Sequence, residues 1–530
     1  MNDVERAKLK GFDNNFRGWA ERGDAAITEE DWNLFKFDGV YNQLHRGYYM
    51  IRIKIPGGRV TAVQARGIAH IADRYARSVM NLTTRQDIQL HWVTIGNVHK
   101  VMEELDLLGL TTKNACGDTV RNIVACPWAG ICTHEAFDIN PYVRAVHDDL
   151  IVREELRNLP RKFKISFNGC SASCAQPQIN DIGYIATRKV TEGVAENGFR
   201  VLAGGGLGAK PILAKAVFDF IPAESVVPVS RAFVKLFRDH GNRKVRTKAR
   251  MKFVLAEWGV EKFRQTLMDY IRQEESVDAN EIIPASPIEQ GGAIQPPDEY
   301  VGIYPQKQRD RMIIRALVRR GDLSASQLYR VADLADKYGD GTVTFTNRQN
   351  LELHWVHTTD TNELTAQLRW LGFDVNGHSH LADTVACVGT TLCNKAVAES
   401  PELAHRIMDT FGGDQRYSVV FRNFRVHING CPNACAQHHT ADLGFMGLVK
   451  NVDGKKREAY QIAIGGHLQG AGRVGDVCAK AVYPEKCVDL VRSVLDVFMR
   501  ERHSSESFAD CYERKGNAFW SEVVRPYLVA

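Results

Sequence analysis

The chain has 530 residues, of which 44% are hydrophobic and 25% charged, and its formal net charge is +5. This is the composition of an ordinary soluble globular protein. No apolar run approaches the roughly 20 residues that span a bilayer, and the charged N-terminus lacks the apolar core of a signal peptide. We therefore expect a cytoplasmic protein with no membrane partner. Its 12 cysteines should be reduced and available for metal, not paired in a disulfide scaffold.

The first predicted elements alternate between strands and helices. Isoleucines alternate with charged residues over 51–55, which predicts a half-buried strand. Apolar residues at helical spacing follow over 61–76, then a second strand at 89–93 and a second helix near 97–109. This order favours a small ferredoxin-like α+β lobe.

The same elements recur later in the chain. GVYNQLHRGYYMIRIKIPGG (39–58) matches GIYPQKQRDRMIIRALVRRG (302–321), and TTRQDIQLHWV (83–93) matches TNRQNLELHWV (346–356), both at an offset of 263. The offset becomes 261 before the cysteines. Duplication of a unit of about 260 residues explains this pattern, and a short-period solenoid does not.

Four cysteines in each copy repeat with one spacing: Cys-x5-Cys, 37 intervening residues, then Cys-x3-Cys. Thiolates are soft ligands that suit iron–sulfur clusters. Buried structural thiols are one alternative, and the fixed register in two copies argues against it. Structural zinc is another, but zinc favours closer cysteine pairs. The cysteines are Cys126, Cys132, Cys170 and Cys174 in the first copy, and Cys387, Cys393, Cys431 and Cys435 in the second.

Two glycine pairs also recur, Gly204-Gly205 and Gly465-Gly466. The stretch GGGLGA (204–209) superficially fits a dinucleotide-binding fingerprint. The second copy continues with His467 and breaks that fingerprint. We therefore reject a nicotinamide site and expect both pairs to let the backbone approach a bulky bound group.

Basic residues are dense in RDHGNRKVRTKARMKF (238–253). Such a run is usually a solvated face, and a nucleic-acid patch is the common functional alternative. No stacking aromatic residues or nucleic-acid motif accompany it. We expect no nucleic-acid partner and prefer a polycarboxylate ligand.

TVACVGTTLC (384–393) followed by NGCPNAC (429–435) resembles the siroheme-dependent sulfite and nitrite reductases, over roughly 30–530 of the chain. The resemblance implies a pseudo-twofold α+β (mixed α/β) fold. Each half would have a ferredoxin-like lobe and a lobe that binds siroheme and a [4Fe–4S] cluster. It also implies that one cluster is held by Cys387, Cys393, Cys431 and Cys435, the last of which bridges to the siroheme iron.

The repeat and the resemblance together predict the domain organisation. We expect an N-terminal extension (1–38), a first ferredoxin-like lobe (39–115), a first siroheme/Fe–S lobe (116–281), a Pro- and Gly-rich linker (282–300), a second ferredoxin-like lobe (301–376) and a second siroheme/Fe–S lobe (377–530).

The resemblance also assigns an anion pocket, in which four basic residues from the opposite half surround the substrate. Matched by motif, these catalytic residues are Arg52, Arg121, Lys162 and Lys164, and Arg85 matches a residue that contacts siroheme carboxylates. Arginines stay protonated and orient oxygens. Lysines can release protons and be recharged from solvent, so the two lysines are the predicted acids.

The first-half cysteines depart from the family pattern, because assimilatory members usually carry cysteines only in the second half. We expect them to hold a second [4Fe–4S] cluster. In the repeat, Arg121 becomes Ala382 and Lys162 becomes Asn423. The anion pocket is thus half lost on that side, and we expect a single active site, on the second-half cluster.

The predicted reaction is the six-electron reduction of sulfite to sulfide, with nitrite reduction to ammonia as the alternative. Lys164 favours sulfite, since nitrite enzymes of the family tend to have Asn there. A precorrin-modifying oxygenase and a non-catalytic electron carrier are further alternatives, and a carrier needs no anion pocket. No flavin or nicotinamide domain is visible, so electrons should come from an external ferredoxin or flavoprotein. The sequence leaves the oligomeric state open.

Overall fold

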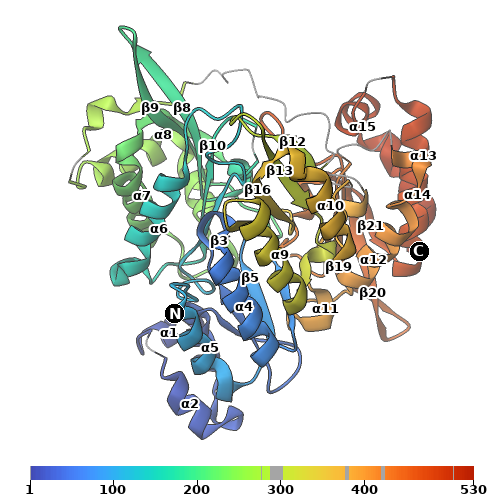
Figure 1. Cartoon of the computed structure of the whole chain (residues 1–530), viewed down its shortest axis with the longest axis horizontal. Coiled ribbons are helices and arrows are strands. Elements are labelled where there is room, and N and C mark those ends of the chain that lie inside the picture. The colour runs from blue at the N-terminus through green and yellow to red at the C-terminus, as the bar shows by residue number, and fades with distance from the viewer. Residues whose placement is uncertain are drawn as a thin grey trace.

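Two mixed α/β lobes flank a central pair of sheets in the computed structural model of the chain (Figure 1). The structure describes residues 2–529 except 13, 173, 276, 287–301, 377–380, 419–423 and 505. In Figure 1 the lobe of the first half is green and that of the second half is orange to red, with blue and yellow elements between them. Each half supplies one central sheet and one lobe, which confirms the predicted duplicated fold.

The two central sheets have the same strand order, and each takes its last strand from the other half. One sheet has the order β1-β2-β5-β4-β14, and the other has the order β12-β13-β16-β15-β3. The predicted strand at 51–55 overlaps β2, which ends at Ile53, and the one at 89–93 lies within β5. The strands are β1 (Val40–Asn42), β2 (Tyr49–Ile53), β3 (Arg59–Thr61), β4 (Val79–Leu82), β5 (Ile88–Val93), β12 (Ile303–Pro305), β13 (Arg311–Ala316), β14 (Asp322–Ser324), β15 (Thr342–Phe345) and β16 (Leu351–His357).

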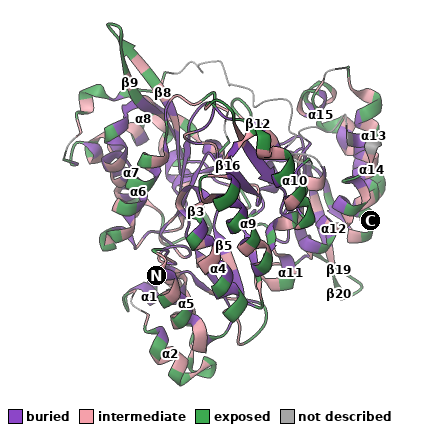
Figure 2. Ribbon diagram, viewed as in Figure 1, coloured by how far each residue is buried: buried purple, intermediate pink, exposed green. Residues whose placement is uncertain are grey.

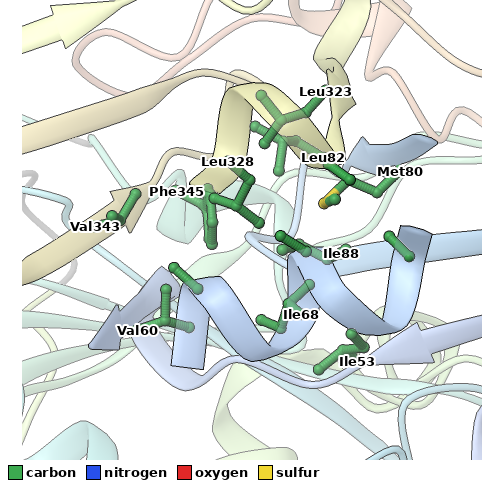
Figure 3. Close-up of a cluster of buried hydrophobic side chains, with 14 of the residues drawn as sticks. Ile53, Val60, Ile68, Met80, Leu82, Ile88, Leu323, Leu328, Val343 and Phe345 are labelled. Carbon is green, nitrogen blue, oxygen red and sulfur yellow. The ribbon is translucent and has the colours of Figure 1, made fainter. Parts of the chain in front are cut away.

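The exchanged strands β3 and β14 join the two predicted ferredoxin-like lobes into one hydrophobic core. They lead into helices α4 (Ala62–Tyr75) and α9 (Ala325–Tyr338), which pack against each other. Thr61 and Ser324 begin these helices with capping boxes, which satisfy free N–H groups of the first turns. Helices α5 (Ile95–Leu107) and α10 (Thr361–Trp370) complete the two units. Figure 3 shows side chains of both halves in this core, among them Val60, Ile68, Leu328, Val343 and Phe345.

Gly58 lies where the first half crosses into the second-half sheet, and it has a positive φ of +74°. A Cβ at this position would lie 2.2 Å from the carbonyl oxygen of Phe345, which is backbone of β15. We expect Gly58→Ala to destabilise the protein by at least about 2 kcal/mol, through strain and steric overlap, seen as a lower Tm in thermal unfolding. Gly96→Ala is the matched control, since a Cβ at that position would have open space for 4 Å around it, and it should leave the Tm unchanged or slightly higher. Equal Tm values for the two variants would contradict the requirement for glycine at position 58, where the chain crosses between the two sheets.

The sheets of the outer lobes place the cysteines at one edge. In each lobe the first three strands are parallel, and parallel neighbours end at the same sheet edge. Cys126 directly follows β6 and Cys387 directly follows β17. The strands are β6 (Val120–Ala125), β7 (Phe163–Asn168), β8 (Ile182–Thr191), β9 (Val194–Ala203), β10 (Lys215–Pro222) and β11 (Ile283–Pro284) in the first lobe, and β17 (Val385–Ala386), β18 (Val426–Asn429), β19 (Leu443–Val452), β20 (Lys455–Ile464) and β21 (Asp476–Val482) in the second.

Helices cover the lobe sheets, with exposed residues on their outer faces and buried strands beneath (Figure 2). Within the described part of the chain, no helix is long and apolar enough to cross a membrane. The covering helices are α6 (Asn140–Val152), α7 (Val226–His240) and α8 (Met251–Ile271) in the first lobe, and α11 (Gly389–Leu392), α12 (Ser400–Phe411), α13 (Gln415–Ser418), α14 (Pro484–Glu501) and α15 (Phe508–Val524) in the second.

The predicted N-terminal extension is folded onto the central core. Phe16 and Phe35 are buried in that core. The extension contains the short helices α1 (Asp3–Lys8), α2 (Phe16–Arg22) and α3 (Glu29–Phe35).

The predicted linker at 282–300 begins inside the first lobe, because Ile283–Pro284 form β11 and pair with β10. Its residues from 287 onward lie outside the described part of the chain. The domain boundaries remain predictions.

The basic run at 238–253 is partly used in internal ion pairs. Arg246 pairs with the buried Asp118 at 2.8 Å, and Arg250 pairs with the buried Asp181 at 2.7 Å. The run is therefore not a continuous free basic patch.

Candidate functional site

Main-chain N–H groups point at the sulfurs of the second-half cysteines. Gly430 donates to Cys387 Sγ at 3.1 Å, and Lys395 donates to Cys393 Sγ at 3.4 Å. Hydrogen bonds of this kind stabilise thiolates and tune the potential of a bound cluster. Of the four cysteines, Cys435 is the exposed one.

A cavity of about 460 Å³ joins the two halves of the chain at these cysteines. The structure brings together residues that the sequence assigned to one site, although they come from opposite halves. Their individual catalytic and binding roles remain predictions. The wall contains Cys387, Cys393, Cys431 and Cys435 from the second half and five residues of the first half that we call the basic face: Arg52, Arg85, Arg121, Lys162 and Lys164.

Burial and mutual repulsion disfavour the charged forms of four residues of the basic face. Arg52 is the exception, because nearby Cys116 and Asp87 outweigh the effect of its burial and raise its pKa. Burial, with Arg161 and Arg250 nearby, lowers the pKa of Lys162 to about 7. Burial, with Arg85 and Lys162 nearby, lowers the pKa of Lys164 well below its usual range. Burial also lowers the pKa of Arg85 to about 9. An anionic ligand would relieve this unfavourable concentration of positive charge.

Hydrogen bonds fix two arginines of the basic face and leave a third with a free donor. The Ala115 carbonyl oxygen accepts from Arg52 Nη1 at 3.2 Å and from Arg121 Nε at 2.8 Å. The Gln89 amide oxygen, in the orientation that satisfies both groups, accepts from Arg52 Nε at 3.2 Å. Arg85 Nε is buried and has no hydrogen-bond partner among the described residues. It is therefore available to an acceptor on a ligand.

Sequence reasoning missed three further residues of the cavity wall: Asp87, Gln89 and His91. All three belong to the TTRQDIQLHWV segment, of which only Arg85 was given a chemical role. Burial raises the pKa of Asp87 to about 6 and lowers that of His91 to about 3, so this histidine is neutral at pH 7. Alternation along β5 places Gln89 and His91 on one face of the strand, whereas Arg85 and Asp87 precede the strand in a turn where Gln86 has a positive φ.

The glycine pairs are required by the protein's own backbone. Gly204 and Gly465 have φ values of +79° and +78°. A Cβ on Gly205 or on Gly466 would lie 2.4 Å from a carbonyl oxygen of the turn in its own lobe. The glycines thus allow two segments of the chain's own backbone to approach each other closely. Contact between these glycines and siroheme remains a prediction.

The first-half cysteines also converge. The thiols of Cys126 and Cys174 lie close enough to shift each other's pKa, and so do those of Cys132 and Cys170. The His134 N–H donates to Cys132 Sγ at 3.4 Å. The first half therefore brings together four thiols of its own.

Two family models match the chain, each in duplicate. Nitrite and sulphite reductase 4Fe-4S domain matches residues 116–275 and 377–528, and Nitrite/Sulfite reductase ferredoxin-like half domain matches 41–108 and 304–369. The chain belongs to the nitrite and sulphite reductase family. It is an oxidoreductase whose cofactors are siroheme and a [4Fe–4S] cluster.

Members of this family from several organisms resemble the chain over nearly its full length. An assimilatory ferredoxin-dependent nitrite reductase from Haloferax mediterranei is 32% identical, over 99% of this chain and 92% of the relative. Sulfite reductase [ferredoxin] 1 from Mycolicibacterium paratuberculosis is 29% identical, over 96% of this chain and 94% of the relative. The solved structure of the Mycobacterium tuberculosis NirA protein has a TM-score of 0.87 and 27% identity, and covers 98% of this chain and 97% of that one.

The cavity residues fit these cofactors chemically. Siroheme is a polycarboxylate, and the basic face offers half-buried basic side chains and a free Arg85 Nε donor to such a ligand. The second-half cysteines offer soft sulfur ligands beside the basic face, as a [4Fe–4S] cluster requires. Among the described residues, the basic face and the second-half cysteines line one cavity, and the sequence assigned both to one site.

Proposed function

We propose that the protein reduces sulfite to sulfide in a six-electron reaction, with nitrite reduction to ammonia as the second candidate at the same site. The cavity that joins the second-half cysteines to the basic face carries this proposal. The relatives support both substrates, since one is named a sulfite reductase and another a nitrite reductase. Lys164 favours sulfite for the reason given above.

Bound siroheme would supply the iron that takes the anion, and the adjacent cluster would supply electrons. Arg52 and Arg121, held on one carbonyl oxygen, orient the oxygens of the anion. Each oxygen that leaves as water requires two protons. Lys162 and Lys164 deliver them, and a pKa of about 7 lets Lys162 both release and regain a proton near neutral pH.

The lobe structure leaves the Lys164 amine available for this role. Its main-chain N–H donates to Asp181 Oδ2 at 2.8 Å, and the charge of Asp181 is balanced by Arg250. The ammonium group therefore does not have to neutralise that carboxylate. It lines the cavity instead.

We propose a ferredoxin as the electron donor and the cytoplasm as the location. The two relatives named above carry the word ferredoxin in their names. Titrating turnover against a reduced ferredoxin and a reduced flavoprotein would identify the donor class.

Lys164→Asn tests the substrate preference. With a chemical reductant, the wild-type holoenzyme should reduce sulfite with a higher kcat/KM than nitrite. The variant should lose at least about tenfold in kcat/KM for sulfite and less for nitrite, because a proton donor near the anion is removed. Equal losses for both substrates would contradict the preference, and protein without siroheme absorption would overturn the proposed function itself.

A further inference from the structure

The first half repeats several hydrogen bonds of the scaffold that holds the second-half cysteines. In both copies a main-chain N–H of the opposite half fixes the loop between the first two cysteines. In both copies a side chain of the opposite half also holds the carbonyl oxygen of the fourth cysteine. The matched bonds are Lys307 N to Ile131 O and Leu44 N to Leu392 O, both 2.9 Å, and Asn347 Nδ2 to Cys174 O and Thr84 Oγ1 to Cys435 O, both 2.7 Å.

One hydrogen bond to sulfur is repeated as well. The N–H···S bonds at Cys132 and Cys393 are each 3.4 Å long and lie at matching positions. Cys174 and Cys435 are the exposed members of their sets. A set of structural thiols would not need donors aimed at sulfur, whereas cluster thiolates use them.

The face opposite the first-half cysteines differs from the basic face, because three arginines at matching positions are each paired with a carboxylate. Arg315, Arg348 and Arg425 stand at the positions of Arg52, Arg85 and Lys164. All three therefore lack the free charge that a polycarboxylate ligand needs. The pairs are Arg315 with Glu352, Arg348 with Asp383 at 2.8 Å, and Arg425 with Asp442 at 3.1 Å.

Two of these carboxylates replace amides of the first half. Glu352 stands at the position of Gln89, and Asp383 stands at the position of Asn122. Ala382 further replaces Arg121. An exchange of amide for carboxylate changes the charge by one unit at almost constant shape. One exchange has the opposite sign, since Asn350 stands at the position of Asp87. With Arg121 and Lys162 also lost from the repeat, this face still carries less positive charge than the basic face.

Bulky side chains also fill this side. Trp128 stands where the second-half loop has Gly389. Its ring centroid lies 4.7 Å from that of Tyr304, and its Nε1 donates to Glu352 at 3.1 Å. Trp128 packs against a buried cluster of Ile131, Tyr304 and Ile313.

We infer that Cys126, Cys132, Cys170 and Cys174 hold a second [4Fe–4S] cluster and that no siroheme lies beside it. The repeated scaffold positions the four cysteines as cluster ligands. The opposite face does not favour a polycarboxylate tetrapyrrole, because its arginines are paired with carboxylates and Trp128 occupies space beside them. This inference rests on the proposed function only in assigning the single siroheme to the second-half cysteines.

Cofactor analysis of the anaerobically purified holoenzyme tests it directly. We expect about nine irons, eight acid-labile sulfides and one siroheme per chain. Electron paramagnetic resonance of the reduced protein should show one cluster coupled to siroheme and one uncoupled cluster. About five irons with one siroheme, zinc at the first-half cysteines, or two sirohemes would each overturn the inference. Absence of siroheme would instead overturn the proposed function.

Paired variants locate the second cluster. The double variant Cys132→Ser/Cys170→Ser should lose about four irons and four sulfides while siroheme stays near one per chain. Cys487→Ser, at a fully buried cysteine outside both sets, is the control and should retain wild-type iron and siroheme. Wild-type iron content in the double variant, or loss of siroheme together with iron, would contradict the assignment. If the double variant fails to fold, the two resonance signals of the wild-type protein still decide the question.

Discussion

Cys435→Ser is expected to reduce sulfite turnover to the background of the reaction without enzyme. Cys435 is the exposed thiol of the second-half set and lines the cavity together with the basic face. The family resemblance gives it the bridge between cluster and siroheme iron, and a serine oxygen is a hard donor that replaces a soft one. Siroheme absorption and turnover, both measured per chain, check the prediction.

Cys174→Ser is the matched control, because Cys174 occupies the same position in the first half. We expect this variant to lose iron from the first-half site while siroheme content and the siroheme absorption spectrum stay near wild type. Equal loss of siroheme in both variants would show that the active half has been assigned wrongly.

The repeat made the main features of the fold predictable from the sequence. Strands and helices at 51–55, 61–76 and 89–93 form where hydrophobic periodicity placed them. The exchange of β3 and β14 between the central sheets was not predictable. Periodicity shows which residues of a strand face the core, but it does not show which neighbouring strand it pairs with.

Motif matching could predict which residues belong to the site. It could not predict which basic side chains keep a free charge, because that depends on the residues that pair with them in the fold. Motif matching found Arg52, and the repeat places Arg315 at the same position of the second half. Only the structure shows that Gln89 leaves Arg52 charged while Glu352 neutralises Arg315. The cross-strand pairs that decide this come from β2 with β5 and from β13 with β16, which are distant in sequence.

Lys162→Ala and Lys164→Ala are each expected to lower sulfite turnover by about 10²–10⁴-fold, the usual effect of removing one well-placed proton donor. Both lysines are half-buried and line the cavity, and neither is expected to bind iron. The spectra of siroheme and of the clusters should therefore stay near wild type. Turnover per siroheme with a chemical reductant isolates the effect from electron delivery by a partner protein.

Arg425→Ala is the control for Lys164→Ala, since Arg425 is the repeat counterpart of Lys164. Its guanidinium is held by Asp442 at 3.1 Å, so it is not available to an anion. We expect turnover per siroheme to stay near wild type, even where loss of the ion pair lowers the Tm. If Arg425→Ala damaged turnover as much as Lys164→Ala does, the second-half face would be catalytic, and one active site per chain would have to give way to two.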